Sequence, residues 1–171
     1  KNEVSYGLPR VRIYLGKLAT AAVAGLLLVF LTLLAYAVLC RLFIPAGPED
    51  WTEIQTFLFR LLAALPLWLG ALSLTMAVMF NVGQTIPMMV VVLLLLAGLG
   101  PVFRGMMRLA GGWLAGWAEV LYRLTLTAPM DLGAAALWDP AYLGWCWGVG
   151  LLWAAGSTAV GLALFARRDI H

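Results

Sequence analysis

The residues that could do chemistry are few, and each lacks the neighbours that its reaction needs. Gly16 and Lys17 form the glycine–lysine pair of a phosphate-binding loop. That motif also needs a glycine five residues earlier and Ser or Thr after the lysine, where this chain has Val11 and Leu18. We therefore expect no cofactor to be bound by this chain. If ATP and Mg²⁺ drive it, a partner chain must bind them.

Hydrolysis and metal chemistry are equally poorly supported. Ser157 after Gly156 could act as a nucleophile only beside a base, and the single histidine, His171, lies at the terminus outside any apolar stretch. No cluster of Cys and His has metal-ligand spacing. Cys40 and Cys146 each stand near the end of an apolar stretch. They would form a disulfide if those ends faced an oxidising compartment, but two reduced, packed thiols are the favoured interpretation. The chain is not expected to be an enzyme.

Charged residues are absent from the interior of the apolar stretches. Arg60 and Arg104 stand at stretch edges, where arginine side chains snorkel to the headgroups. A proton- or ion-coupled pump therefore lacks its usual carriers. Methionines cluster near one short turn, and core filling is their favoured role. The alternative is a flexible lining for a hydrophobic substrate. These methionines are Met76, Met79, Met88 and Met89.

Composition indicates the environment of the elements that would position these residues. Of the 171 residues, 64% are apolar and 11% charged, whereas soluble domains carry about 25% charged residues. Leu18–Leu39 has no charge, and about 20 such residues cross a bilayer core as a helix. Lipid cannot satisfy backbone polar groups, so these spans should be helices. The sequence predicts an all-α polytopic membrane protein.

Four transmembrane helices are predicted, with a permease domain over residues 18–166. The turn between the second and third is so short that these two form an antiparallel hairpin. The spans are Leu18–Leu39, Leu61–Phe80, Ile86–Phe103 and Tyr142–Ala166.

Charge asymmetry sets the expected orientation. The segment before the first span and the tail at residues 167–171 are both net basic, whereas the loop after the first span is net acidic. Since basic residues concentrate on the cytoplasmic side, both ends should be cytoplasmic, in a plasma membrane. The net charge is only +3, and the sequence has no patch of mixed basic and aromatic residues, so nucleic acid is not an expected partner.

The stretch Arg104–Ala141 is too polar for two crossings and too apolar for a solvated loop. It contains Trp113, Trp117 and Tyr122, and aromatic residues of this kind favour the membrane interface. We expect one or two short amphipathic helices on the extracellular side. They would dip into the outer leaflet as a re-entrant region or lie on it.

Glycines recur on one face of the fourth span, at Gly144, Gly148 and Gly156. Small residues at such spacing let two helices approach closely. The face could serve close helix packing or a homodimer seam, although glycine is also frequent in membrane helices without any such role.

The segment before the first span, residues 1–17, has polar residues at helical spacing. Glu3, Gly7 and Arg10 would lie on one face of a short helix interrupted by Pro9. Such a cytoplasmic helix, joined stiffly to a span, could transmit a push from a soluble partner. Simple anchoring of the span is an equally open interpretation.

The pattern Glu3-x3-Gly7-x2-Arg10-x3-Tyr14-Leu15-Gly16-Lys17 resembles the coupling-helix region of type-2 ABC exporter permeases. That family includes bacterial drug, antibiotic-peptide (antimicrobial peptide) and lantibiotic-immunity permeases and the G-subfamily half-transporters. The resemblance implies that the four spans are the last four of six, that the chain is a piece of a longer protein, and that residues 104–141 are the re-entrant region between the fifth and sixth spans. Pro9 departs from the family pattern.

The expected function is therefore a permease subunit of an ATP-driven exporter. Its partners would be a cytoplasmic P-loop ATPase, a second permease copy in a homodimer or related heterodimer, the lipid bilayer, and a hydrophobic or amphipathic substrate such as a peptide, drug or lipid. Coupling would fall to Glu3, Gly7, Arg10 and Tyr14. The alternatives are a non-transporting scaffold or assembly subunit and, less favoured, an ATP-independent channel.

Overall fold

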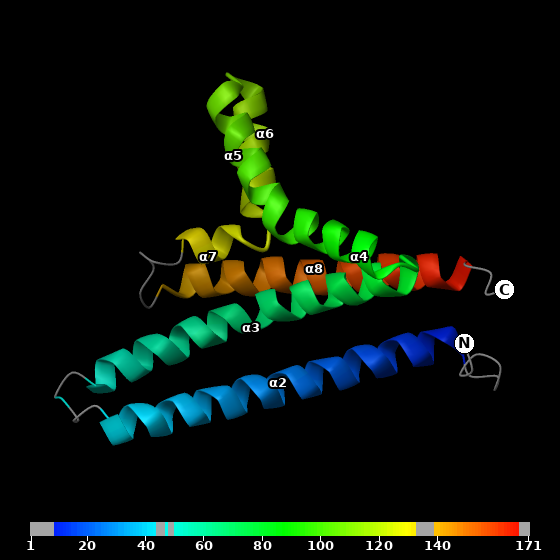
Figure 1. Cartoon of the computed structure of the whole chain (residues 1–171). Coiled ribbons are helices and arrows are strands. Elements are labelled where there is room, and N and C mark those ends of the chain that lie inside the picture. Colours follow the sequence, from blue (N-terminus) through cyan, green and yellow to red (C-terminus); the bar gives the residue numbers. More distant parts are fainter. Residues whose placement is uncertain (1–8, 44–46, 48–49, 133–138, 168–171) are drawn as a thin grey trace. The chain divides into compact units, whose positions relative to one another are not determined.

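The computed structural model describes residues 9–43, 47, 50–132 and 139–167. Helices make up nearly all of these residues, and none of them lies in a strand, which confirms the all-α prediction. The elements are α2 (Arg10–Phe43), α3 (Asp50–Asn81), α4 (Thr85–Leu93), a π-helical turn (Leu94–Gly98), α5 (Leu99–Leu109), α6 (Trp113–Arg123), α7 (Ala128–Leu132) and α8 (Pro140–Arg167) (Figure 1).

Four helices are long and apolar enough to cross a membrane. Each contains one of the predicted spans and extends beyond it. These helices are Arg10–Phe43, Trp51–Asn81, Thr85–Leu109 and Pro140–Arg167.

The chain divides into two compact units, Lys1–Phe59 and Arg60–His171. In the first, α2 begins directly after Pro9, whose carbonyl accepts hydrogen bonds from the backbone N–H groups of Arg12 and Ile13 at 2.9 and 3.2 Å. Proline lacks an N–H and is tolerated where a helix begins. The helix then runs without a break through Lys17 into the apolar stretch. The described part of the predicted coupling segment is therefore the first turns of the span helix.

The third apolar helix changes direction inside its length. We predicted that it would end at Phe103, but helix continues to Leu109, and the bend comes earlier, at the π-helical turn (Figure 1). Pro101 explains the bend, because it cannot donate to the carbonyl one turn earlier, and a proline or a π-helical turn is a common cause of a kink.

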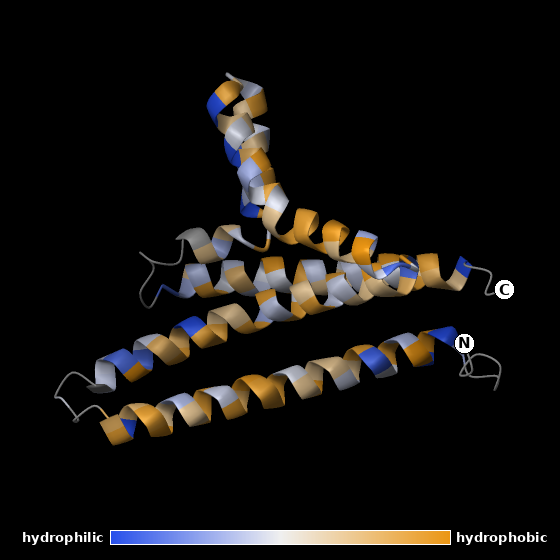
Figure 2. Cartoon of the chain, in the orientation of Figure 1, coloured by the Kyte–Doolittle hydropathy of each residue, from blue (hydrophilic) through white to orange (hydrophobic). Residues whose placement is uncertain are grey.

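Beyond this bend, α5 and α6 form an antiparallel hairpin whose helices pack against each other. The chain reverses at Gly112, whose φ of 65° lies in the left-handed region that favours glycine. Figure 2 shows that α4 is apolar along its length, whereas α5 and α6 carry hydrophilic residues among the apolar ones. The amphipathic helices expected after Arg104 are thus present, although the first of them begins at Leu99.

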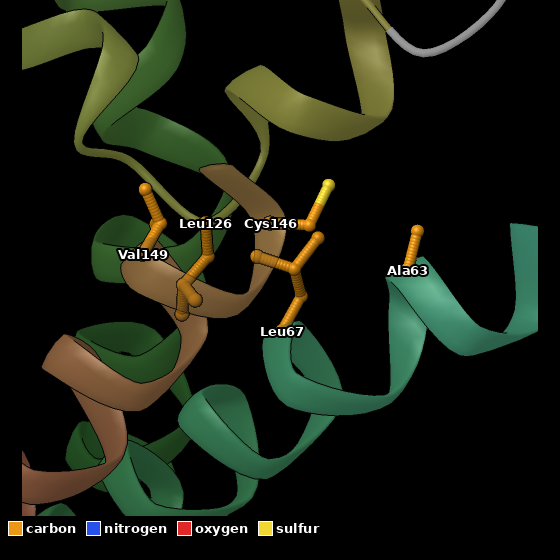
Figure 3. Close-up of a cluster of buried hydrophobic side chains, with 5 residues drawn as sticks. All are labelled: Ala63, Leu67, Leu126, Cys146 and Val149. Atoms are coloured by element: carbon orange, nitrogen blue, oxygen red, sulfur yellow. The ribbon is translucent and has the colours of Figure 1, made fainter. Parts of the chain in front are cut away.

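The core of the second unit lies between α3 and α8. Ala63 and Leu67 of α3 meet Cys146 and Val149 of α8, and Leu126 enters from the segment between α6 and α7 (Figure 3). This segment, Leu124–Thr127, is called the connector below. It is the point at which the α5–α6 hairpin is tied to the two long helices.

Candidate functional site

Helices α3 and α8 touch backbone to backbone. A methyl group added at Gly150 of α8 would lie 2.3 Å from the carbonyl carbon of Pro66 and 2.4 Å from its oxygen. One added at Gly70 of α3 would lie 2.9 Å from the Gly150 carbonyl oxygen. Real side chains do not approach so closely, so this crossing requires glycine on both helices.

Polar side chains reinforce the crossing toward the end of α3. The Ser73 hydroxyl donates to the Ala154 carbonyl at 2.9 Å and accepts from the Thr158 hydroxyl at 2.6 Å. Further along, the Asn81 side-chain amide donates to the Gly161 carbonyl at 3.3 Å. Hydrogen bonds of this kind hold membrane helices together where apolar surface alone gives no preference for protein over lipid. The α3–α8 pair is therefore joined by side-chain hydrogen bonds from Ser73 to Asn81 of α3.

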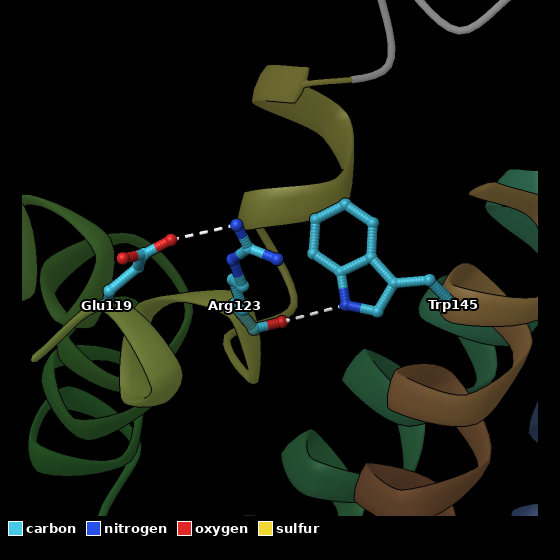
Figure 4. A network of polar contacts seen from close by, with 3 residues as sticks. All are labelled: Glu119, Arg123 and Trp145. Atoms are coloured by element: carbon cyan, nitrogen blue, oxygen red, sulfur yellow. Dashed lines mark hydrogen bonds and ion pairs between the residues drawn. The ribbon is translucent and has the colours of Figure 1, made fainter. Parts of the chain in front are cut away.

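Two tryptophans of α8 bind the last residue of α6 and the first residue of the connector. The indole N–H of Trp145 donates to the Arg123 carbonyl at 3.1 Å (Figure 4), and that of Trp153 donates to the Leu124 carbonyl at 2.7 Å. A helix leaves its last four carbonyls without partners in the helix itself. The two indoles satisfy carbonyls of this kind at the end of α6.

Hydrogen bonds from Thr125 and from Tyr142 of α8 hold the backbone on either side of the connector. The Thr125 hydroxyl donates to the Tyr122 carbonyl at 2.8 Å, and the Tyr142 hydroxyl donates to the Pro129 carbonyl at 2.9 Å. The side chain of Leu126 is buried in the core. Within the connector the Leu124 carbonyl receives a side-chain donor, and so do the carbonyls of Tyr122, Arg123 and Pro129 on either side of it.

The base of the α5–α6 hairpin is closely packed against the connector. A methyl group at Gly100 would lie 3.0 Å from the Thr127 hydroxyl oxygen. The Arg104 guanidinium stands 5.3 Å from the centre of the Tyr122 ring, a cation–π contact. On the exposed side of α6, Arg123 and Glu119 form an ion pair at 2.8 Å (Figure 4). The site is thus a joint between the hairpin and the α3–α8 pair.

Nothing in this joint resembles a reaction centre. The Ser157 hydroxyl, the one nucleophile that the sequence offered, donates to the Trp153 carbonyl of its own helix at 2.5 Å. In the part of the chain that the structure describes, no group of three or more His, Cys, Asp or Glu side chains could hold a metal ion. What the arrangement can do is hold irregular backbone in a fixed position.

Of the residues predicted to couple to a partner ATPase, Glu3 and Gly7 lie outside the described residues. Arg10 is half-buried at the start of α2, and the Tyr14 side chain is completely buried. Complete burial was not predicted for Tyr14, because the sequence places it among basic residues at the end of a span. The coupling role of these four residues stays a prediction.

The predicted packing glycines are not the ones that form the helix crossing. Gly144, Gly148 and Gly156 are exposed, and a methyl group at any of them would meet no described atom within 4 Å outside the local helix. Contact with another chain stays a prediction for this face. The crossing uses Gly70 and Gly150 instead. Small residues four apart on α8, at Gly150, Ala154 and Thr158, were the available signal, which sequence reasoning missed.

The four methionines do not share one environment. Met76 is buried and Met88 half-buried, whereas Met79 and Met89 are 57% and 55% exposed. A substrate path lined by them stays a prediction. Cys40 and Cys146 are free thiols, and Cys146 is completely buried in the core, as expected for a packed residue.

Comparison with known protein families, curated proteins and solved structures finds no match to this chain.

Proposed function

We propose that this chain is the membrane-spanning permease subunit of an ATP-driven ABC exporter. A separate P-loop ATPase would bind ATP and Mg²⁺, a second permease copy would complete the transport path, and the exported substrate would be hydrophobic or amphipathic. The observation that carries the proposal is the connector, which ties a helical hairpin between the third and fourth apolar helices to the side of α8. The resemblance to the family implies a re-entrant region at this place, and the hydrogen-bonded connector supports that assignment.

The depth of the connector along α8 supports this assignment. Helix α8 has 28 residues and is about 42 Å long, and the hydrocarbon core of a bilayer is about 30 Å thick. Trp145 and Trp153 stand about 8 Å and about 20 Å from the Pro140 end of α8. If α8 is centred in the bilayer, the carbonyls that these indoles bind lie inside the hydrocarbon core.

Irregular backbone at that depth must be covered or bonded, because lipid offers no donors. The indole bonds satisfy the Arg123 and Leu124 carbonyls, and Leu126 is buried, as this requirement demands of those residues. A loop lying in water would need neither the indole bonds nor a buried side chain, since water would satisfy its carbonyls. The rest of the hairpin carries Arg104, Arg108 and Glu119 among apolar residues, as expected for amphipathic helices near the headgroups.

The basic start of α2 would face the cytoplasm and receive the motion of the ATPase. Because Arg10 to Lys17 belong to the same helix as the apolar stretch, a displacement at Arg10 would be carried into the membrane by a stiff rod. Closure of the ATPase pair on ATP would thereby turn the path from inward-facing to outward-facing. Arg10 and Tyr14, with Glu3 and Gly7, are the proposed contacts.

A pull-down of the full-length protein from its native membranes tests the proposal. Tagged protein is extracted in mild detergent, and ATP hydrolysis is assayed on the eluate. We expect a P-loop ATPase to co-purify, and expect Glu3→Ala with Arg10→Ala to release or uncouple it. Arg41→Ala, a cation removed from the opposite end of α2, is the matched control and should leave the complex intact. Absence of any ATPase under conditions that preserve membrane complexes would refute the proposal.

The second candidate is a membrane scaffold or assembly subunit, and the apolar surface of α2 favours it. Within its own unit the most apolar part of this helix is not buried, so that unit leaves a large apolar surface for partner helices or lipid. In that case the same pull-down would recover integral membrane partners without ATPase activity.

A further inference from the structure

The hairpin has two attachments to the rest of its unit, and they differ in kind. At its first end, α4 leads into α5 through the π-helical turn and Pro101, where regular helical hydrogen bonding is interrupted. At its second end, the connector is bonded to α8 by two indoles and wedged into the core by Leu126. The first attachment can bend, whereas the second is fixed at several points.

We propose that Trp145 and Trp153 are positioning residues that anchor the connector to α8, so that the α5–α6 hairpin moves with the α3–α8 pair and not with α4. This inference needs α8 to cross a bilayer, but it does not need the chain to be an exporter.

The positions of the two indoles on α8 support an anchoring role. The two indoles project from α8 about two turns apart, yet they bind the carbonyls of consecutive residues, Arg123 and Leu124. These carbonyls end α6, where a helix lacks its own donors. Other tryptophans of the same unit, Trp113 and Trp117, are 73% and 61% exposed on the hairpin.

The contribution of these two hydrogen bonds to anchoring depends on whether lipid or water surrounds them. Arg123 and Leu124 are exposed at the protein surface, so in water a solvent molecule could replace either indole at little cost. At the depth of the hydrocarbon core no water replaces it, and the carbonyl would be left unsatisfied. The anchoring effect should therefore be larger in a bilayer than in a water-exposed setting.

The chain contains its own reporter for release of the connector. The Cys146 thiol is completely buried in the cluster that contains Leu126 (Figure 3). When Leu126 leaves the cluster, Cys146 loses part of its cover. The rate of Cys146 alkylation therefore measures how often the connector opens, provided that Cys40 is replaced.

The test uses the full-length protein with Cys40→Ser, reconstituted in lipid vesicles and treated with N-ethylmaleimide, with Cys146 labelling followed by mass spectrometry. Trp153→Phe keeps the aromatic ring and removes the donor. We expect it to raise the labelling rate by about threefold or more, which corresponds to about 0.6 kcal/mol for a bond between membrane helices. Trp145→Phe, whose bond is longer, should give a smaller rise in the same direction.

Trp113→Phe and Trp117→Phe, at exposed positions of the hairpin outside the buried cluster, are the controls for the substitution itself and should label at the parent rate. Leu126→Ala is the positive control, since it removes the cover directly. The proposal is overturned if both indole variants label like the parent while Leu126→Ala labels faster, because apolar packing alone would then hold the connector. It is equally overturned if the control tryptophan variants accelerate labelling as much as Trp153→Phe. None of these outcomes depends on a co-purifying ATPase, so the two proposals can fail separately.

Discussion

The contact between α3 and α8 leads to the sharpest prediction, which is that Gly150→Ala destabilises the protein. The new methyl group would stand 2.3 Å from a backbone carbon of Pro66 and 2.7 Å from the Leu67 nitrogen. Neither atom belongs to a flexible side chain, so the clash cannot be relieved by a rotamer change. The helices themselves must separate.

The size of the effect follows from that separation. Ordinary contact begins near 3.4 Å, so the helices must open by about 1 Å at this point. A gap of that size forfeits up to about half of the local dispersion energy, and it would stretch the 2.9 Å bond from Ser73 to Ala154 beyond hydrogen-bonding distance. Overpacking of this kind costs about 1–3 kcal/mol, and we expect about 2 kcal/mol here.

The assay is an SDS titration of protein in mild detergent, with unfolding followed by circular dichroism and tryptophan fluorescence. Gly70→Ala, where the new contacts begin at 2.9 Å, should give a smaller loss. Gly116→Ala is the control, because its methyl group meets no described atom within 4 Å, and alanine in place of helical glycine adds up to about 1 kcal/mol. If Gly150→Ala proved as stable as Gly116→Ala, the backbone contact between α3 and α8 would be wrong.

Two further predictions concern the surfaces of the same helices. Ser73→Ala should lower the free energy of unfolding by about 1 kcal/mol in the same titration, because it removes two hydrogen bonds to α8. Thr75→Val should change the free energy of unfolding little, because the Thr75 hydroxyl donates to the Ala71 carbonyl of its own helix. Equal losses from these two substitutions would contradict an interhelical role for Ser73. Gly148→Leu places a large side chain in open space, so it should not lower the free energy of unfolding, but it should abolish chemical cross-linking between copies if the exposed glycine face is a dimer seam. Undiminished cross-linking would locate any dimer contact elsewhere.

How much the sequence could predict depended on the kind of feature. The four long helices were predictable because a bilayer demands a minimum run of apolar residues, and Leu18–Leu39 satisfies that demand without any tertiary contact. The start of α2 at Pro9 and the turn at Gly112 also follow from local backbone chemistry. The bend at the π-helical turn was missed, although Pro101 was a signal for it.

The buried face of each membrane helix could not be predicted in the same way. In a soluble helix, apolar residues mark the face that packs on the core. In lipid, both the packed and the exposed faces are apolar, so hydropathy does not separate Gly150, which is buried, from Gly148, which is exposed. That ambiguity is why sequence reasoning did not single out Gly150 as the glycine of the α3–α8 crossing.

By itself, the sequence determined that the chain forms long apolar helices with an amphipathic interruption after the third, because helix formation and membrane partitioning depend on local composition. Only the tertiary structure decided that Trp145 and Trp153 bind the connector and that Gly70 and Gly150 form the crossing. Those pairings join residues far apart in the chain, such as Trp153 with Leu124 and Gly70 with Gly150. Their geometry depends on how α8 is rotated about its axis, and no local pattern fixes that rotation.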